Sequence, residues 1–257
     1  MGLPVPQTKQ RFAVEASGFT HEVGRGDRVT VAQRSLLKAS LSASPLPWRL
    51  TNSPGTFQIS TMLDLDRIRR RLAVPRNDPP IPTDARQAAV AVILRDRRGL
   101  TELLFIQRAV KDGDPWSGHM AFPGGHKDPE DVDLLAAAIR ETDEEIGLDI
   151  SDAAVIGSLP PARPMSVRRT MVVKPFVFEI NGDPSFAPNH EVADVVWTPL
   201  DAMYRGENHA VDNPEGGAMQ FNGFRLGGGH FVWGMTYRMV QTFFETVDPG
   251  YQRRPEW

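Results

Sequence analysis

The sequence predicts an α/β fold in which helices cover a mixed β-sheet. Two observations lead to this class. Short apolar segments of strand length recur between residues 88 and 197, and turn residues separate them. Two segments have helical periodicity, one between Asp133 and Gly147 and one over Gly234–Val247, and they supply the helices that such a sheet needs on its faces.

The elements before the first strand read as a helix and a linker. Met62, Leu65, Ile68 and Leu72 keep helical spacing, so a helix is expected here. The stretch from Pro75 to Pro82 is rich in proline, which removes backbone donors and favours an extended connection. We interpret it as a linker to the sheet.

The strands begin with a predicted hairpin, Ala88–Leu94 and Leu103–Gln107, joined by a turn at Asp96–Gly99. A short helix with an early proline is expected at Pro199–Met203. Further strands are expected at His119–Phe122, Ala154–Leu159, Met171–Ile180 and Val192–Trp197.

The helix between Asp133 and Gly147 has one mainly apolar face, expected to pack on the core. That stripe consists of Leu135, Ala138, Ile139, Thr142 and Ile146. Asp133 is a suitable N-cap, and Gly147 is a suitable left-handed residue to end the helix.

The same helix carries three carboxylates at positions i, i+3 and i+4, namely Glu141, Glu144 and Glu145. This spacing places them side by side, where like charges repel and weaken the helix. A bound divalent cation gives a reason for the arrangement, because carboxylate oxygens are hard ligands for Mg²⁺ or Mn²⁺. An ordinary solvated acidic face is the alternative. Arg140 lies four residues before Glu144 and is expected to orient it.

With the Gly124–Gly125 turn upstream, this segment resembles the Nudix box, whose pattern ends in R-E-U-x-E-E-x-G-U, where U is a bulky apolar residue. Thr142 is a weak match for the first U. The matching residues are Arg140, Glu141, Glu144, Glu145, Gly147 and Leu148.

The upstream half of the box differs from the general pattern. Val132 stands where that pattern has a glutamate, and His126 stands where it has a glycine. The form found here, G-G-x-x-D-x-x-D, resembles the coenzyme A pyrophosphatase branch of the family. This resemblance implies that Asp131 takes the place of the missing glutamate. Farther upstream, that branch has two arginines at fixed distances before a glycine that Gly118 matches. Arg108 is one residue too far from Gly118, and Asp114 occupies the position of the second arginine.

The resemblance implies a Nudix-type α/β/α sandwich and metal-dependent hydrolysis of a diphosphate linkage in a nucleoside diphosphate derivative. The expected substrate is coenzyme A, split into 3′,5′-ADP and 4′-phosphopantetheine, with Mg²⁺ or Mn²⁺ as cofactor. The expected metal ligands are Glu141, Glu144 and Glu145, which with Arg140 form the catalytic set. Substrate contacts are expected from Arg108, Gly124, Gly125 and Arg168.

Two other functions stay open at this stage. An ADP-ribose or other nucleoside-diphosphate-sugar pyrophosphatase is the runner-up, because that branch has a proline about where Pro164 lies, 16 residues after Leu148. A non-catalytic Nudix-like ligand sensor is the alternative from another class. It predicts eroded carboxylates, whereas those of this helix are intact.

Composition narrows the class of protein. The chain has 257 residues, 40% hydrophobic and 24% charged, which suits one well-packed domain. Its net charge of -3 gives no electrostatic case for nucleic acid as a partner. No apolar run has the length of a membrane span. The absence of cysteine excludes disulfides and thiolate chemistry and is compatible with a cytoplasmic location. The sequence leaves open whether two copies of the chain form a homodimer.

Residues 1–61 differ from the remainder. They are rich in Ser, Thr, Gly and Pro, and their apolar pieces have no sustained period. We therefore expect a disordered or loosely ordered extension over 1–61, a Nudix hydrolase domain over 62–247, and a C-terminal tail over 248–257.

A chain that starts at Met62 is accordingly expected to keep the melting temperature and the activity of the full chain. The composition of the first 61 residues buries too little apolar surface to offset the entropy of ordering them. Thermal unfolding and a hydrolysis assay on both chains check this, and a loss of either property would mean that the extension stabilises the domain.

Overall fold

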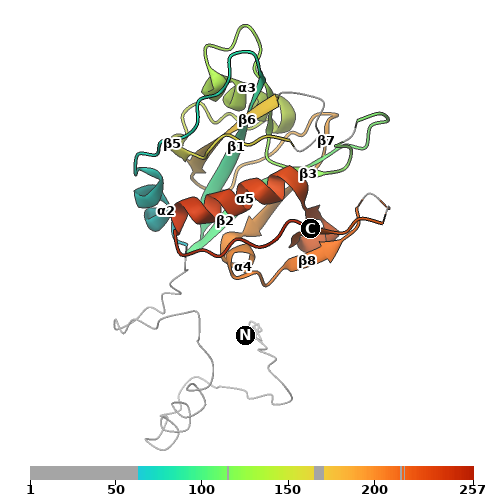
Figure 1. Cartoon of the computed structure of the whole chain (residues 1–257). Coiled ribbons are helices and arrows are strands. Elements are labelled where there is room, and N and C mark those ends of the chain that lie inside the picture. Colours follow the sequence, from blue (N-terminus) through green and yellow to red (C-terminus); the bar gives the residue numbers. More distant parts are fainter. Residues whose placement is uncertain (1–62, 115, 165–170, 215, 217) are drawn as a thin grey trace, which may run out of the picture. The chain divides into compact units, whose positions relative to one another are not determined.

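The structure, a computed structural model, describes residues 63–114, 116–164, 171–214, 216 and 218–257 (Figure 1). The extension expected over residues 1–61 and the candidate residue Arg168 lie outside this part of the chain.

Helices separate runs of strands along the described chain. The strands are β1 (Arg86–Arg97), β2 (Leu100–Arg108), β3 (Met120–Ala121), β4 (Gly124–His126), β5 (Ala154–Ser158), β6 (Met171–Ile180), β7 (Val192–Pro199), β8 (His209–Asp212), β9 (Phe221–Arg225) and β10 (Phe231–Val232). The helices are α2 (Leu65–Leu72), α3 (Leu134–Ile146), α4 (Leu200–Arg205), α5 (Gly234–Val247) and the 3₁₀ turn η1 (Gly227–Gly229). In the described ranges, none of these helices is long and apolar enough to cross a membrane.

Strand β1 is the centre of a seven-stranded sheet. It runs parallel to β6, with Arg86 opposite Met171 at one end and Arg95 opposite Ile180 at the other. It is antiparallel to β2 and to β4. Strand β5 extends the sheet beyond β6, while β3 and β7 pair with β2. One parallel pair among antiparallel ones makes the sheet mixed, as the sequence predicted.

Both faces of β1 are buried, which explains its nearly continuous apolar sequence. Val90, Val92 and Leu94 pack in one cluster with residues of α2 and α5. Ala91 and Ile93, which point to the other face, pack in a second cluster with the end of α3. Figure 1 shows α5 crossing the near side of the strands. The helices thus cover both faces, and the α/β/α arrangement is confirmed.

The predicted hairpin is formed by β1 and β2. Its turn is the two-residue loop Arg98–Gly99, where both φ angles are positive, at 57° and 82°. This conformation matches the twist of the flanking strands and favours glycine at the second position. The Gly99 amide donates to Asp96 Oδ1 at 3.0 Å, which closes the turn.

Strands β8 and β9 pair with each other and, through β9, with β10 in a separate three-stranded sheet. Neither β8 nor β9 was predicted from the sequence. The residues expected as a C-terminal tail, 248–257, contact this region and α5. The Arg254 amide donates to Gln241 Oε1 at 2.7 Å, and the Asn222 amide donates to the Glu256 carbonyl at 3.0 Å.

Candidate active site

Helix α3 has the boundaries that its caps predict. Asp133 lies in extended conformation and accepts a hydrogen bond from the Ala136 amide at 2.8 Å. Gly147 ends the helix with φ at 64°, and its amide donates to the Asp143 carbonyl. Both caps are therefore confirmed, and they fix the register of every side chain on the helix.

The inner face of α3 approaches the sheet closely because its central residues are small. Ala137 and Ala138 are fully buried against Ala89 of β1. Thr142 is also buried and donates to the Ala138 carbonyl at 2.7 Å, which satisfies its hydroxyl inside the core. This close packing brings the neighbouring acidic face of the helix over strand β4.

Strand β4 supplies the two glycines that the sequence analysis singled out. A Cβ on Gly125 would lie 2.4 Å from the carboxyl carbon of Glu141, so only glycine leaves room for that carboxylate. Gly124 has φ at 141° and a Cβ there would lie 2.3 Å from the Ala89 carbonyl oxygen. The Gly124 amide donates to Glu145 Oε2 at 2.8 Å. The turn and the acidic helix therefore fit against each other directly.

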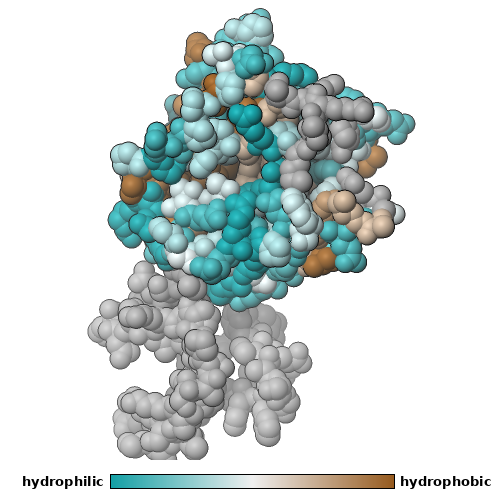
Figure 2. Space-filling view, in the orientation of Figure 1, coloured by the Kyte–Doolittle hydropathy of each residue, from teal (hydrophilic) through white to brown (hydrophobic). Residues whose placement is uncertain are grey.

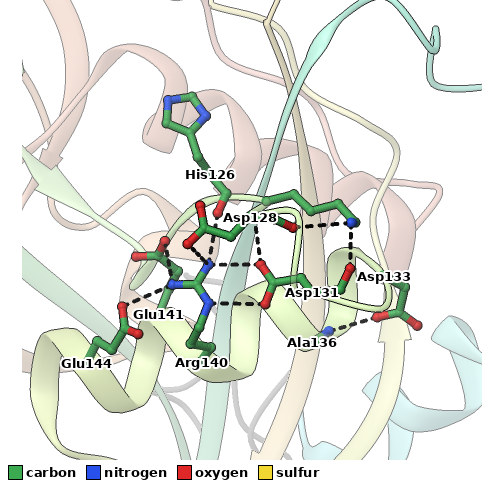
Figure 3. Close-up of polar contacts among 9 residues, drawn as sticks. His126, Asp128, Asp131, Asp133, Ala136, Arg140, Glu141 and Glu144 are labelled. Atoms are coloured by element: carbon green, nitrogen blue, oxygen red, sulfur yellow. Dashed lines mark hydrogen bonds and ion pairs between the residues drawn. The ribbon is translucent and has the colours of Figure 1, made fainter.

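Arg140 joins the loop before α3 to the acidic face of the helix (Figure 3). One terminal nitrogen of its guanidinium lies 3.1 Å from Glu141 Oε1 and 3.0 Å from Glu144 Oε2. The other donates to the His126 carbonyl at 3.1 Å. The expected contact between Arg140 and Glu144 is present, and Glu141 shares the same nitrogen.

Asp131 is the second anchor of Arg140. It accepts from the guanidinium Nε at 3.1 Å and from a terminal nitrogen at 2.9 Å, and its side chain is almost buried. It also accepts from the Asp128 amide at 2.8 Å. The hydrogen bond from Arg140 is the main reason that the pKa of Asp131 lies below its usual value. Asp131 thus positions Arg140, a contact that the sequence analysis did not identify.

Glu145 is buried, and burial raises the pKa of its carboxyl to about 7. The Gly124 amide and the positive charge of Arg108 act in the opposite direction, while the charges of Glu141 and Glu191 raise the pKa further. Burial also raises the pKa of Glu141, against the opposing effect of Arg140. Two carboxyls that are costly to ionise therefore face the same glycine turn.

Arg108, expected to bind substrate, forms an ion pair with Asp114. One terminal nitrogen of its guanidinium lies 2.9 Å from Asp114 Oδ2, and its Nε is buried without a hydrogen-bond partner in the described residues. Burial works to raise the pKa of Asp114, but the hydrogen bonds from Arg108 and the Trp116 amide outweigh it and lower the pKa. The charges of Arg108 and Glu191 act on the pKa of Glu145 in opposite directions.

The donor set fits a hard divalent cation in its chemistry. Glu141 and Glu145 are desolvated carboxylates whose raised pKa values a cation would lower. Within the described residues, no three carboxylate or imidazole side chains converge closely enough to hold an ion. Glu141 and Glu144 turn to Arg140, while Glu145 turns to the Gly124 amide. Glu144 is mostly exposed, so it has room to turn.

The raised pKa of Glu145 gives a test in metal-free protein. The folded state holds the Glu145 proton up to about pH 7, whereas the ordinary value is 4.5. Between these values the folded state binds more protons, so its stability falls as pH rises. The melting temperature of the wild type, relative to Glu145→Gln, should therefore fall from pH 4.5 to pH 8 in excess EDTA. A difference that is independent of pH would contradict the burial argument.

Comparison with known proteins supplies further findings. A solved structure of a MutT/nudix family protein from Enterococcus faecalis is 21% identical, covers 67% of this chain and 66% of its own, and has a TM-score of 0.45. Similar curated proteins include the human "Mitochondrial coenzyme A diphosphatase NUDT8". It is 34% identical over 173 residues, which cover 65% of this chain and 72% of the relative.

The "Uncharacterized Nudix hydrolase NudL" of Shigella flexneri is 35% identical over 162 residues, covering 62% of this chain and 82% of the relative. The sequence profile of the NUDIX domain matches residues 85–216, a range that includes strand β1, the glycine turn and all of α3. This match covers half of the chain. The chain therefore belongs to the Nudix family and is a Nudix hydrolase.

Proposed function

We propose that this Nudix pyrophosphatase hydrolyses the diphosphate of coenzyme A to 3′,5′-ADP and 4′-phosphopantetheine. The observation that carries the chemistry is the packing of Glu141 and Glu145 against the Gly124–Gly125 turn. The choice of substrate is supported by the G-G-x-x-D-x-x-D form of the motif and by the similarity to the human coenzyme A diphosphatase. In this reaction water adds to one phosphorus, and the bridging oxygen leaves with the other phosphate.

The catalytic cation in this proposal is Mg²⁺ or Mn²⁺, since members of the family typically use a divalent metal. When bound, such an ion neutralises phosphate oxygens and lowers the pKa of a coordinated water. Glu141 and Glu145 are the principal ligands that we assign, because they are the two desolvated carboxylates beside the turn. Glu144 is assigned as a further ligand or as the carboxylate that orients water.

Arg140 is assigned as a positioning residue. Its bonds to Asp131 and to the His126 carbonyl hold it in place, and it holds Glu141 and Glu144 in turn. Arg108 is assigned to the substrate phosphates for two reasons. Its buried Nε has no acceptor in the described residues, and its positive charge lowers the pKa of Glu145. Arg168 keeps the same proposed role, outside the described residues.

The substrate is tested by measuring hydrolysis of CoA, ADP-ribose and NADH, each with Mg²⁺ or Mn²⁺. We expect CoA to give the highest kcat/KM, excess EDTA to abolish turnover, and added metal to restore it. A preference for ADP-ribose would favour the nucleoside-diphosphate-sugar alternative. Undiminished hydrolysis in excess chelator would rule out the metal-carboxylate assignment.

Glu145→Gln is expected to lower kcat by about 10²-fold or more, because it removes one negative charge from the proposed metal site. Asp143→Asn is the matched control. It removes a carboxylate from the same helix, but Asp143 is exposed and lies outside the proposed site, so its kcat should stay close to that of the wild type. If the two variants have equal kcat at saturating Mg²⁺, Glu145 is not a ligand.

Gly125→Ala tests the close approach of the turn to the helix. The new methyl group would overlap the Glu141 carboxylate, which is the end of a flexible side chain and must move away. We expect a folded protein with a melting temperature near that of the wild type and a loss of kcat on the order of tenfold or more, the range typical of a misplaced catalytic group. Full activity would show that Glu141 need not lie over Gly125.

A further inference from the structure

A cavity on the α5 side of the sheet carries three arginines that come from three separate segments. Arg163 follows β5, Arg238 lies on α5, and Arg253 lies in the C-terminal segment. The cavity has a volume of ≈ 290 Å³. This is at the lower end for ligand sites, so it suits a small group rather than a whole cofactor.

The carboxylates beside the cavity leave an excess of positive charge. Arg253 lies 2.9 Å from Glu245 Oε2 and 3.2 Å from Glu256 Oε1, so its charge is balanced. Glu256 also lies 3.6 Å from the Nε of Arg238. Arg163 is exposed and has no ion-pair partner among the described residues. Three cations thus face two anions, neither of which lines the cavity.

Arg238 has donor capacity that the protein does not use. One terminal nitrogen donates to the Arg163 carbonyl at 2.7 Å, which fixes the direction of the guanidinium. Its Nε lies 3.6 Å from Glu256 Oε2, beyond hydrogen-bond distance, and has no hydrogen-bond partner within the described residues. The guanidinium thus makes one hydrogen bond and one long ion pair, and an anion in the cavity would give it a further charged acceptor.

The apolar part of the cavity wall strengthens an ion pair between an arginine and a bound anion. Leu159, Pro160, Pro161, Pro175 and Met239 line the cavity. These side chains are apolar and lower the local dielectric, so an ion pair here is stronger than one in water. Figure 2 shows a mainly hydrophilic surface where α5 and the C-terminal residues face the viewer.

The cavity and the catalytic turn lie at the same level of the sheet but on opposite faces. Pro175 of β6 is opposite Val90 of β1, and Val90 is opposite Gly124 of β4. Two strand spacings amount to about 10 Å. Met239 belongs to α5 on one face, whereas Glu141 belongs to α3 on the other. The arginine cavity is therefore a site separate from the acidic helix.

We propose that this cavity binds a phosphate monoester or free phosphate through Arg238, with Arg163 as the second cation. A phosphate dianion presents acceptor oxygens in several directions, which suits the guanidinium groups of Arg238 and Arg163 from two separate segments. A planar carboxylate has one charge and two oxygens and leaves more of these donors unpaired. The phosphate is either a group of the enzyme's own nucleotide substrate or product, or a free ion.

The site is tested by calorimetric titration of the metal-free full chain with inorganic phosphate and with 3′,5′-ADP in excess EDTA. EDTA removes binding through a catalytic metal, so the result does not depend on the proposed activity. We expect saturable binding that Arg238→Met weakens by roughly tenfold, the loss typical of a charged hydrogen bond. Arg163→Met should weaken it less, and higher salt should weaken it in the wild type.

Arg70→Met is the matched control, because Arg70 is an exposed arginine on α2 outside this cavity. Its affinity for phosphate should equal that of the wild type. If Arg238→Met does not fold, Arg163→Met decides alone, since the exposed Arg163 side chain has no described contact. Absence of saturable binding in the wild type, or equal affinity in the cavity variants and the control, would overturn the proposal.

The two sources of phosphate are separated by comparing the affinities for 3′,5′-ADP and inorganic phosphate. A cavity that takes the phosphate monoester of a nucleotide binds 3′,5′-ADP more tightly, and Arg238→Met weakens that binding. A cavity that takes the free ion binds inorganic phosphate at least as tightly as 3′,5′-ADP. Failure of both ligands to bind would overturn the proposal, and this comparison does not depend on the proposed function.

Discussion

The guanidinium of Arg140 is the constraint on which the rest of the site depends. It is held by Asp131 and by the His126 carbonyl, and it contacts Glu141 and Glu144. One side chain therefore ties the loop that follows the glycine turn to the acidic face of α3. Without it, Glu141 and Glu144 would lose the charged partner that offsets their mutual repulsion on the helix.

The sheet sets the other half of this geometry. Strand β4 pairs with the first part of β1, and the small inner residues of α3 let the helix approach the same strand. Glu145 is thereby buried against the Gly124 amide, in surroundings where ionisation of its carboxyl is costly. One close contact between α3 and the sheet thus has two results. It buries the small residues of the helix, and it places Glu145 where a cation would favour the ionised carboxylate. Burial of Glu145 therefore lowers the stability of the metal-free protein and favours cation binding.

Much of this arrangement could be predicted from local sequence. Asp133 and Gly147 bounded α3 correctly, because caps act through bonds to nearby backbone. The two-stranded segment β8–β9 was missed, because its short strands pair across a loop and pack on α5 rather than showing a sustained period. The bond between Arg140 and Asp131 was missed for a similar reason, since spacing along one helix does not reveal how a preceding loop folds back. The Arg108–Asp114 pair likewise depends on the loop between β2 and β3.

The central claim is that the acidic face of α3 holds a divalent cation. Electron paramagnetic resonance of free Mn²⁺ during titration of the protein measures this directly, without a substrate. We predict one saturable site, with weaker binding in Glu141→Gln and in Glu145→Gln and affinity like that of the wild type in Asp143→Asn. Binding that is unchanged in the Glu141→Gln, Glu145→Gln double variant, or no binding to the wild type at millimolar Mn²⁺, would contradict it.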